Sequence, residues 1–133
     1  MGGDSRTGIC PIGWHLPDTT EWKILFATVG GQASASKVLK SKSLWKTCEN
    51  WSWLNGNGSD DYGFSALPAG GVGDKGFYGE GEYASFWSSS ANNGNPYGNS
   101  IYYMYMVARY NYAVYRSTHE KTRKKSIRCV KDE

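Results

Sequence analysis

The chain has little of what several large protein classes require. It contains no apolar run near the roughly 20 residues that span a bilayer, so we expect no direct membrane insertion of this domain. Its 15 Lys and Arg are nearly matched by 12 Asp and Glu, and a formal net charge of +3 is too small to predict nucleic-acid binding. Long runs of Leu, Ala, Glu and Lys are also missing, which argues against a helical bundle.

Metal-binding and redox residues are scarce as well. The two His are far apart and the three Cys include no Cys-x-x-Cys pair, a pattern that argues against a zinc site. Cys10 and Cys129 stand almost at the chain ends, and a disulfide between them would tie the termini together. The alternative is two buried free thiols. Cys48 is left over in either case.

Aromatic residues and glycine are abundant instead. Six Trp, ten Tyr, four Phe and 17 Gly favour a domain of short strands and ordered loops. The length of 133 residues suits one domain over 1–133. Residues 1–8 are expected to be a linker or the remnant of a trimmed segment.

Two helices are predicted in the first third of the chain. Asp18 precedes Glu21 by three residues, which is the spacing of a capping box. An apolar stripe follows at Trp22, Leu25, Phe26 and Val29, and Gly30-Gly31 ends it. A second helix is expected from Ser34 to about Lys42, with Val38 and Leu39 inward and the lysines outward.

The rest of the chain is predicted to form loops and strands. Residues 44–61 are expected to form a long ordered loop pinned by Trp side chains, because disordered segments avoid aromatic residues. Predicted strands cover residues 63–71 (running into a Gly-rich turn), 84–90, 101–108, 113–117 and 126–130. Residues 92–99 form a polar loop, and residues 109–112 connect two strands of a hairpin.

Four blocks carry a resemblance to a known family. They are Cys10–Pro17 with Glu21-Trp22, Gly63–Gly70, Phe86–Ser90 and Ser126–Asp132. In this order they resemble the signature blocks of the Fibrobacter succinogenes major paralogous domain over nearly the whole chain. The resemblance implies an α+β, C-type-lectin-like fold of the formylglycine-generating-enzyme branch, with two short helices flanking small antiparallel β-sheets.

The same resemblance implies that the termini are adjacent, which fits a disulfide between Cys10 and Cys129. It also implies an exported or surface-attached bacterial protein. Lys124-Lys125 stand where the family usually has Gly-aromatic, so we expect a looser or more exposed closing hairpin.

A finer resemblance concerns residues 86–130. They are similar to the C-terminal variable region of proteins that retroelements diversify, in which Tyr, Asn, Ser, His, Asp and Gly are scattered over a fixed scaffold. The candidate ligand-binding residues are Asn92, Asn93, Asn95, Tyr97, Asn99, Tyr103, Tyr105, Arg109, Tyr110, Asn111, Tyr112, Tyr115, Ser117 and His119. Diversification of this tract is a hypothesis.

Composition supports a binding surface independently of any retroelement. Tyr offers large, rigid contact area and Asn, Ser and Gly offer adaptable hydrogen bonds, as in antibody paratopes. Residues alternate between the two faces of a strand, so Met104 and Met106 are expected in the core and Tyr103 and Tyr105 in solvent, beside Tyr115. The alternative is that these tyrosines merely cover the sheet.

The expected partner is an unidentified protein or glycan. The calcium-binding tripeptides of sugar-binding C-type lectins are missing, although Asn55, Asn57, Asp60 and Asp61 could hold a structural calcium. A carbohydrate-binding or structural module of a surface protein, such as an adhesin or pilus tip, is the alternative. The cationic residues of 116–128 could attract phosphate or sulfate, but a solvated hairpin is the favoured interpretation.

An enzyme is not expected. The sulfatase-modifying enzymes of this branch use two closely spaced Cys near the C-terminal end, whereas Cys129 stands alone there. No acid–base couple can be placed on the carboxylate pairs of the loops. His15 is expected to form structural hydrogen bonds.

Overall fold

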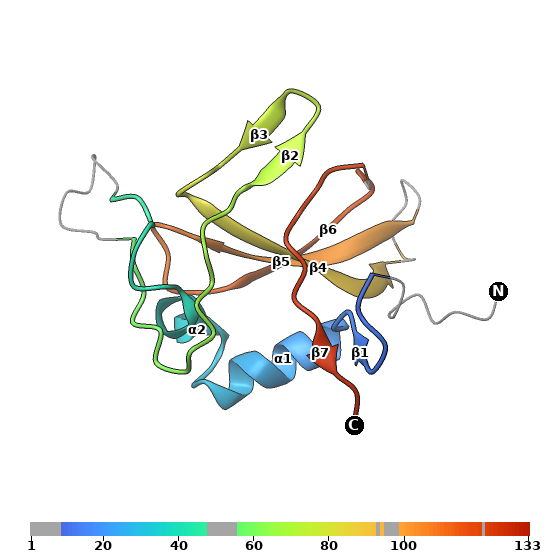
Figure 1. Ribbon diagram of the computed structural model, residues 1–133, viewed down its shortest axis with the longest axis horizontal. Coiled ribbons are helices and arrows are strands. Elements are labelled where there is room, and N and C mark those ends of the chain that lie inside the picture. The colour runs from blue at the N-terminus through green and yellow to red at the C-terminus, as the bar shows by residue number, and fades with distance from the viewer. Residues whose placement is uncertain (1–8, 48–55, 93, 95–98, 121) are drawn as a thin grey trace.

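The computed structural model describes residues 9–47, 56–92, 94, 99–120 and 122–133, which form an α+β domain (Figure 1). In chain order the elements are β1 (Trp14–His15), α1 (Thr19–Thr28), α2 (Gln32–Leu39), β2 (Gly71–Gly73), β3 (Gly76–Tyr78), β4 (Tyr83–Asn92), β5 (Ser100–Val107), β6 (Val114–Thr118) and β7 (Val130–Lys131). The described strands form three antiparallel sheets, β1-β7, β2-β3 and β4-β5-β6. None of the described helices is long and apolar enough to cross a membrane.

Helix α1 confirms the predicted capping box. The Asp18 side chain accepts from the backbone N–H of Glu21 at 2.8 Å, and the Glu21 carboxylate accepts from the Asp18 N–H at 3.2 Å. Trp22 and Phe26 are buried along the inner face of the helix. Both ends are determined locally, because cap and stripe are adjacent in sequence.

Helix α2 is displaced from the predicted range of 34–42. It begins at Gln32 after Gly31 and ends at Leu39, because Lys40 adopts extended backbone angles. The prediction that the lysines point outward is wrong for Lys40, which is only 2% exposed. Lys37 and Lys42 are exposed as expected.

The β4-β5-β6 sheet divides the molecule into two sides. Figure 1 shows α1 and α2 on one side of this sheet and the β2–β3 hairpin projecting on the other. The core fills the space between helices and sheet, with Trp22, Phe26, Val29, Ala35, Leu39, Trp45, Ala66, Ala84, Phe86, Met104, Met106, Ala108 and Ala113. The sheet face turned away from the helices is therefore free of this core.

The segment predicted as a strand over 63–71 is mostly irregular. It touches its neighbours through two isolated parallel bridges, Lys40–Ala66 and Gly70–Ala84. Gly70 has a φ of 66°, and a Cβ there would collide with the carbonyl oxygen of Tyr78. This close approach, which only glycine permits, turns the chain into the β2–β3 hairpin.

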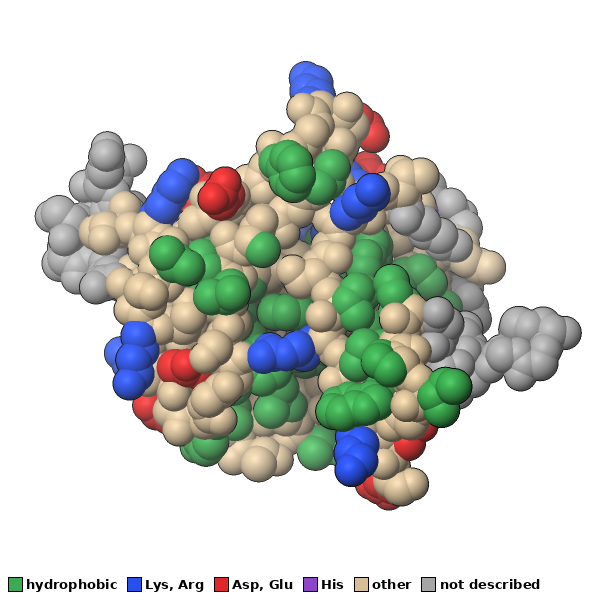
Figure 2. Space-filling view, in the orientation of Figure 1, with side chains coloured by type: hydrophobic (Ala, Val, Ile, Leu, Met, Phe, Trp, Pro, Cys, Tyr) green, Lys and Arg blue, Asp and Glu red, His purple; other side chains and the backbone are tan. Residues whose placement is uncertain are grey.

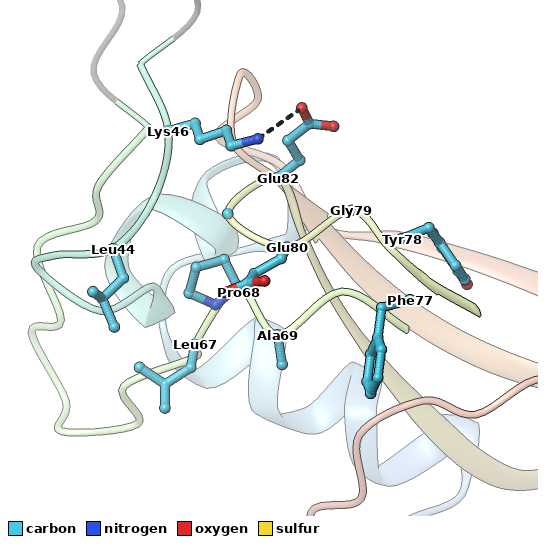
Figure 3. Close-up of a pocket in the computed structure, with 11 residues that line it drawn as sticks. Leu44, Lys46, Leu67, Pro68, Ala69, Phe77, Tyr78, Gly79, Glu80 and Glu82 are labelled. Carbon is cyan, nitrogen blue, oxygen red and sulfur yellow. Dashed lines mark ion pairs between the residues drawn. The ribbon is translucent and has the colours of Figure 1, made fainter. Parts of the chain in front are cut away.

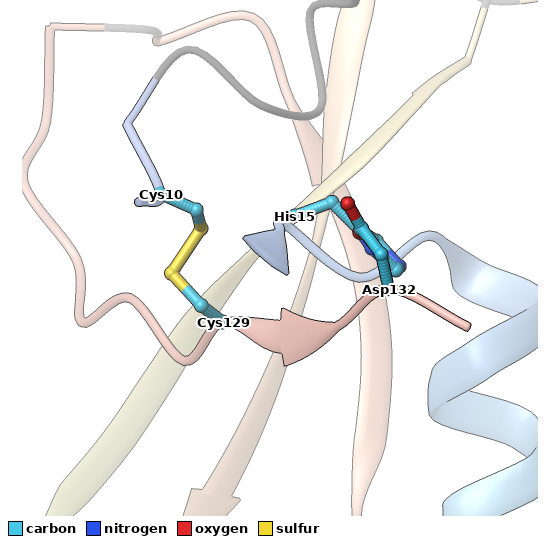
Figure 4. Close-up of a disulfide and its surroundings, with 4 residues drawn as sticks. All are labelled: Cys10, His15, Cys129 and Asp132. Carbon is cyan, nitrogen blue, oxygen red and sulfur yellow. A yellow bond between two sulfur atoms is a disulfide. The ribbon is translucent and has the colours of Figure 1, made fainter. Parts of the chain in front are cut away.

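The chain ends are joined as expected. Strand β1 pairs with β7, and a disulfide links Cys10 to Cys129 with a Cα–Cα distance of 5.9 Å (Figure 4). The predicted strand over 126–130 is shorter than expected, because Ser126 makes only an isolated bridge to Phe86 before β7 begins at Val130.

His15 has the structural role predicted for it. Its Nδ1 lies 2.5 Å from the Asp132 carboxylate and its Nε2 lies 2.6 Å from the Glu21 carboxylate. The ring is buried at 6% exposure, next to the terminal disulfide (Figure 4). His15 thus connects the first turn of α1 to the C-terminal end of the chain.

Candidate ligand-binding site

Strand β5 separates core from solvent as its alternation predicts. Met104 and Met106 are each 1% exposed and face the helices. Tyr103 and Tyr105 point to the opposite face and are half-buried. The predicted outward orientation of these two tyrosines is therefore confirmed, but they are half-buried rather than fully exposed to solvent.

Tyr115 lies on the other face, which corrects the prediction that it is exposed beside them. It pairs with Met104 across β5 and β6, and directly paired residues share a face. Its ring contacts Phe26 at 5.6 Å and packs on the core. Burial raises the pKa of the Tyr115 hydroxyl to about 12.

A row of aromatic rings crosses the outer face of the sheet. Trp87 of β4 pairs with Tyr103, and their ring centroids are 6.2 Å apart. Tyr103 in turn stacks on Tyr105 at 5.8 Å with an interplanar angle of 30°. We call Trp87, Tyr103 and Tyr105 the aromatic row. Sequence reasoning missed Trp87, although its alternation with buried Phe86 signals an outward position.

The loop between β5 and β6 extends this row. Tyr110 and Tyr112 stack at 4.7 Å with an interplanar angle of 20°, and the Arg109 guanidinium lies 5.1 Å from the Tyr110 ring centre. Loss of solvent raises the pKa of the Tyr112 hydroxyl, and the neighbouring Tyr110 and then Tyr105 raise it further. The loop therefore carries a second aromatic stack, Tyr110 on Tyr112, where the chain leaves β5.

Side chains of α2, together with Lys40 directly after it, anchor this loop. The buried Lys40 ammonium donates to the carbonyl oxygens of Val107 at 2.6 Å and Tyr110 at 2.9 Å. The Ser36 hydroxyl also donates to the Tyr110 carbonyl, at 3.2 Å. Gln32 adds two further hydrogen bonds, to the backbone of residue 113. The loop that displays Tyr110 and Tyr112 is thus anchored through its backbone.

Other candidate residues lie at the opposite end of the sheet. Asn92, Asn99, Ser117 and His119 are near the start of β5, whereas Arg109, Tyr110, Asn111 and Tyr112 follow its end. The eight residues of β5 separate these two groups by about 24 Å. Asn92 donates to the Ser117 hydroxyl at 3.3 Å. Asn93, Asn95 and Tyr97 lie outside the described residues, as does Cys48.

Cationic side chains surround the aromatic row. The Lys125 ammonium lies 4.0 Å from the Tyr103 ring centre and 5.4 Å from that of Trp87. Arg116 lies directly opposite Tyr103 on β6. Burial raises the pKa of Tyr103, the adjacent Tyr105 raises it further, and Arg116 acts in the opposite direction.

The segment expected to be loose at Lys124-Lys125 is paired with the hairpin. The backbone N–H of Lys124 donates to the Val72 carbonyl at 2.9 Å, and the N–H of Val72 donates back at 3.0 Å. This antiparallel bridge places Lys125 over the rings of the aromatic row.

The oxygen-rich loop considered for calcium uses much of its capacity internally. The Asn57 side-chain oxygen accepts from the Trp45 N–H at 3.0 Å, and the Asp60 carboxylate accepts from both the N–H and the hydroxyl of Ser65. These bonds lower the pKa of Asp60. Asn55 lies outside the described residues, and within them no group of three or more His, Cys, Asp or Glu is placed to hold a metal ion.

A hollow of about 800 Å³ lies between the β2–β3 hairpin and the loop before it (Figure 3). Leu44, Leu67 and Phe77 line it and are 70%, 53% and 86% exposed. A 3.6 Å ion pair between Lys46 and Glu82 closes one side. Figure 2 shows hydrophobic side chains gathered on the hairpin and below it, so apolar surface is not confined to the aromatic row.

One comparison with known proteins identifies a family. A model of the Fibrobacter succinogenes major domain matches residues 3–131 of the chain. No curated protein and no solved structure matches it.

Proposed function

The chain belongs to the Fibrobacter succinogenes major domain family, and on that basis we propose that it is an exported ligand-recognition module. It binds a protein or glycan partner through the aromatic row and the adjoining loop of residues 109–112. The observation that carries this proposal is the gathering of three aromatic rings, Trp87, Tyr103 and Tyr105, on the side of the sheet turned away from the helices. The loop after β5 adds a second aromatic stack, Tyr110 on Tyr112.

The hydrophobic core does not depend on these rings. The core on the other side of the sheet already contains its own aromatic cluster of Trp22, Phe26, Phe64 and Phe86. A half-buried Tyr keeps apolar area in contact with water, and covering that area with a partner releases about 25 cal/mol per Å². Tyr also loses little side-chain entropy on binding, since it has two rotatable bonds.

The rigidity of the surface supports the same proposal. Paired strands hold Tyr103 and Tyr105. Side-chain hydrogen bonds from Ser36 of α2 and from Lys40 hold the backbone of the loop beyond them. A surface ordered before binding loses less conformational entropy when the partner arrives. The scaffold therefore tolerates exchange of side chains on the outer face.

We further propose a C-type-lectin-like fold in which a retroelement diversifies residues within 86–130. Two helices, small antiparallel sheets and adjacent termini support the fold assignment. Sister sequences that differ mainly at outward Tyr, Asn and Ser positions between residues 92 and 119 would support diversification. Uniform change along the chain would contradict it, as would free exchange at Tyr115, which packs on the core.

The location that we propose is the cell exterior. The disulfide between Cys10 and Cys129 is compatible with an oxidising compartment, where such bonds persist. A carbohydrate-binding or structural module without a diversified site is the second candidate. The aromatic row favours carbohydrate as the partner in that case, because Tyr and Trp combine a large apolar face with a polar group that can hydrogen-bond. A catalytic role is not proposed.

An array of glycans and extracellular proteins, probed with and without calcium, tests the proposal. The wild-type domain is compared with a Tyr103→Ser/Tyr105→Ser variant. Tyr62→Ser is the matched control, because Tyr62 is 59% exposed and lies outside the β4-β5-β6 sheet. We expect the double variant to lose binding and the control to keep it.

Urea unfolding of each variant separates loss of binding from loss of folding. An array signal that survives the double change would refute the assignment of the surface. An array that stays empty for the wild type would count against recognition of glycans and extracellular proteins altogether.

A further inference from the structure

The positive charges beside the aromatic row have no carboxylate partner among the described residues. Lys125 lies over two rings, at 4.0 Å from Tyr103 and 5.4 Å from Trp87, and no described carboxylate lies within 4.0 Å of its ammonium. An aromatic face attracts a cation without cancelling its charge, so the ammonium remains available to an anion. Lys125 is half-buried, which confines the ammonium to one place above the rings.

Arg116 and Arg109 also lie beside aromatic residues of this surface. Arg116 is exposed on β6 opposite Tyr103, and Arg109 is exposed beside Tyr110. Among the described residues neither forms a salt bridge. Three cations thus border the aromatic surface, one over the row, one beside it and one on the loop.

Some cations elsewhere are paired with carboxylates, whereas Lys75 and Lys124 at the β2–β3 hairpin form no salt bridge among the described residues. Arg123 forms a salt bridge with Glu120, and Lys46 lies 3.6 Å from Glu82. Lys125 and Arg116 nevertheless lie directly beside the rings, without a carboxylate within 4.0 Å among the described residues. An anionic group placed there would form charge-assisted hydrogen bonds without competing with a carboxylate of the protein.

We propose that the ligand of the aromatic row is an acidic glycan, whose sugar rings pack against the row beside Lys125 while carboxylate or sulfate groups bind Lys125 and Arg116. This inference rests on the proposed function and names the ligand class of the same site. Calcium has no part in it, because the protein's own cations supply the positive charge.

Two other classes of anionic ligand fit the surface less well. Nucleic acids require many phosphate contacts, whereas the whole chain has a formal net charge of only +3. Acidic peptides are usually held by a side chain buried in a pocket. None of the hollows described for this protein is lined by Trp87, Tyr103 or Tyr105, and their stacked rings offer a platform instead.

Binding of four probes to the full chain tests this inference. Dextran sulfate and polygalacturonate supply sulfate and carboxylate, neutral dextran of similar length supplies sugar rings alone, and a 20-nucleotide single-stranded DNA supplies phosphate. Kd is measured by isothermal titration calorimetry at two salt concentrations. The variants are Lys125→Gln, Arg116→Gln and, as a control of equal charge change, Lys131→Gln in β7.

We expect at least one acidic glycan to bind about tenfold more tightly than neutral dextran. Lys125→Gln and Arg116→Gln should each weaken that binding about tenfold, since one hydrogen bond to a charged group is lost in each. Lys131→Gln should leave it unchanged, because Lys131 pairs with Trp14 at the joined termini. Whichever polymer binds better identifies the anionic group as sulfate or carboxylate.

Three results would overturn the inference. They are equal affinity for neutral and acidic polymers, an equal loss in the Lys131→Gln control, or tighter binding of DNA than of either acidic glycan. Neutral dextran that binds and is lost in Tyr103→Ser/Tyr105→Ser would retain the proposed function while refuting the ligand class.

Discussion

Lys40→Met is expected to destabilise the protein by about 3 kcal/mol, through loss of the contacts that anchor the ligand-binding loop. Met fills a similar volume in this site, which is 2% exposed, but it cannot donate hydrogen bonds. The ammonium donates to the carbonyls of Val107 at 2.6 Å and Tyr110 at 2.9 Å, and it lies 4.7 Å from the Trp45 ring centre.

The magnitude follows from what each group keeps after the change. The Val107 carbonyl still accepts from the Tyr110 N–H, and the Tyr110 carbonyl still accepts from the Ser36 hydroxyl. Each lost bond therefore costs near the lower end of the range for charged groups, about 1.5 kcal/mol. Loss of the cation–π contact with Trp45 adds about 0.5–1 kcal/mol. The Met side chain also removes the cost of burying an ammonium, which offsets a part of the lost stability.

Urea denaturation at equilibrium measures the change, as a lower midpoint with an unchanged m-value. Lys37→Met is the matched control, because Lys37 lies three residues away in α2 with an exposed side chain, and we expect it to change stability by less than about 0.5 kcal/mol. Hydrogen exchange should also show faster exchange of the amides of residues 108–113 in Lys40→Met alone. A Lys40→Met variant as stable as the control would refute the anchoring role.

Three further predictions concern stability and titration. The folded-state pKa of Tyr115 is about 12, above its ordinary value of 10, so its contribution to stability is complete below pH 10 and is lost between pH 10 and 12. The last phase of a spectrophotometric tyrosine titration should therefore disappear in Tyr115→Phe. Persistence of that phase would contradict the assignment. Hydrogen bonds from Ser65 lower the pKa of Asp60, so they stabilise the fold at pH values above 3.8, the ordinary pKa of an Asp side chain. This stability is lost as the pH falls through the lowered folded-state pKa. The difference in Tm between wild type and Ser65→Ala should therefore shrink in acid, and a constant difference would argue against this role of Ser65. Reduction of the Cys10–Cys129 disulfide, which spans 119 residues, should lower the free energy of unfolding by up to about 5 kcal/mol. Urea titrations with and without dithiothreitol measure this change. Unchanged midpoints would show that the disulfide does not stabilise the fold.

Local patterns predicted those parts of the structure that depend on neighbouring residues. The Asp18–Glu21 capping box and the apolar stripe behind it specify α1 within one stretch of sequence. The alternation of Tyr and Met along β5 likewise specifies which side chains face the core, since a strand has a period of two. The terminal disulfide could also be predicted, because Cys10 and Cys129 lie in blocks that resemble a known family.

The face of Tyr115 depends on information from outside its own strand. In the hairpin, Val114 pairs with Tyr105, which places Tyr115 opposite Met104 on the core side. A shift of one residue in this register would exchange the two faces. The length and anchoring of the loop between β5 and β6 determine the register, and those contacts come from α2.

By itself, then, the sequence determined the type of protein: an aromatic-rich α+β domain with a capped first helix, an amphipathic strand β5 and joined ends. Only the tertiary structure decided which tyrosines form the candidate site and which cations accompany them. Lys40 became an internal anchor and Lys125 came to lie over Trp87 and Tyr103, because segments distant in sequence meet there. Periodicity describes one element at a time, whereas a binding surface is composed of several.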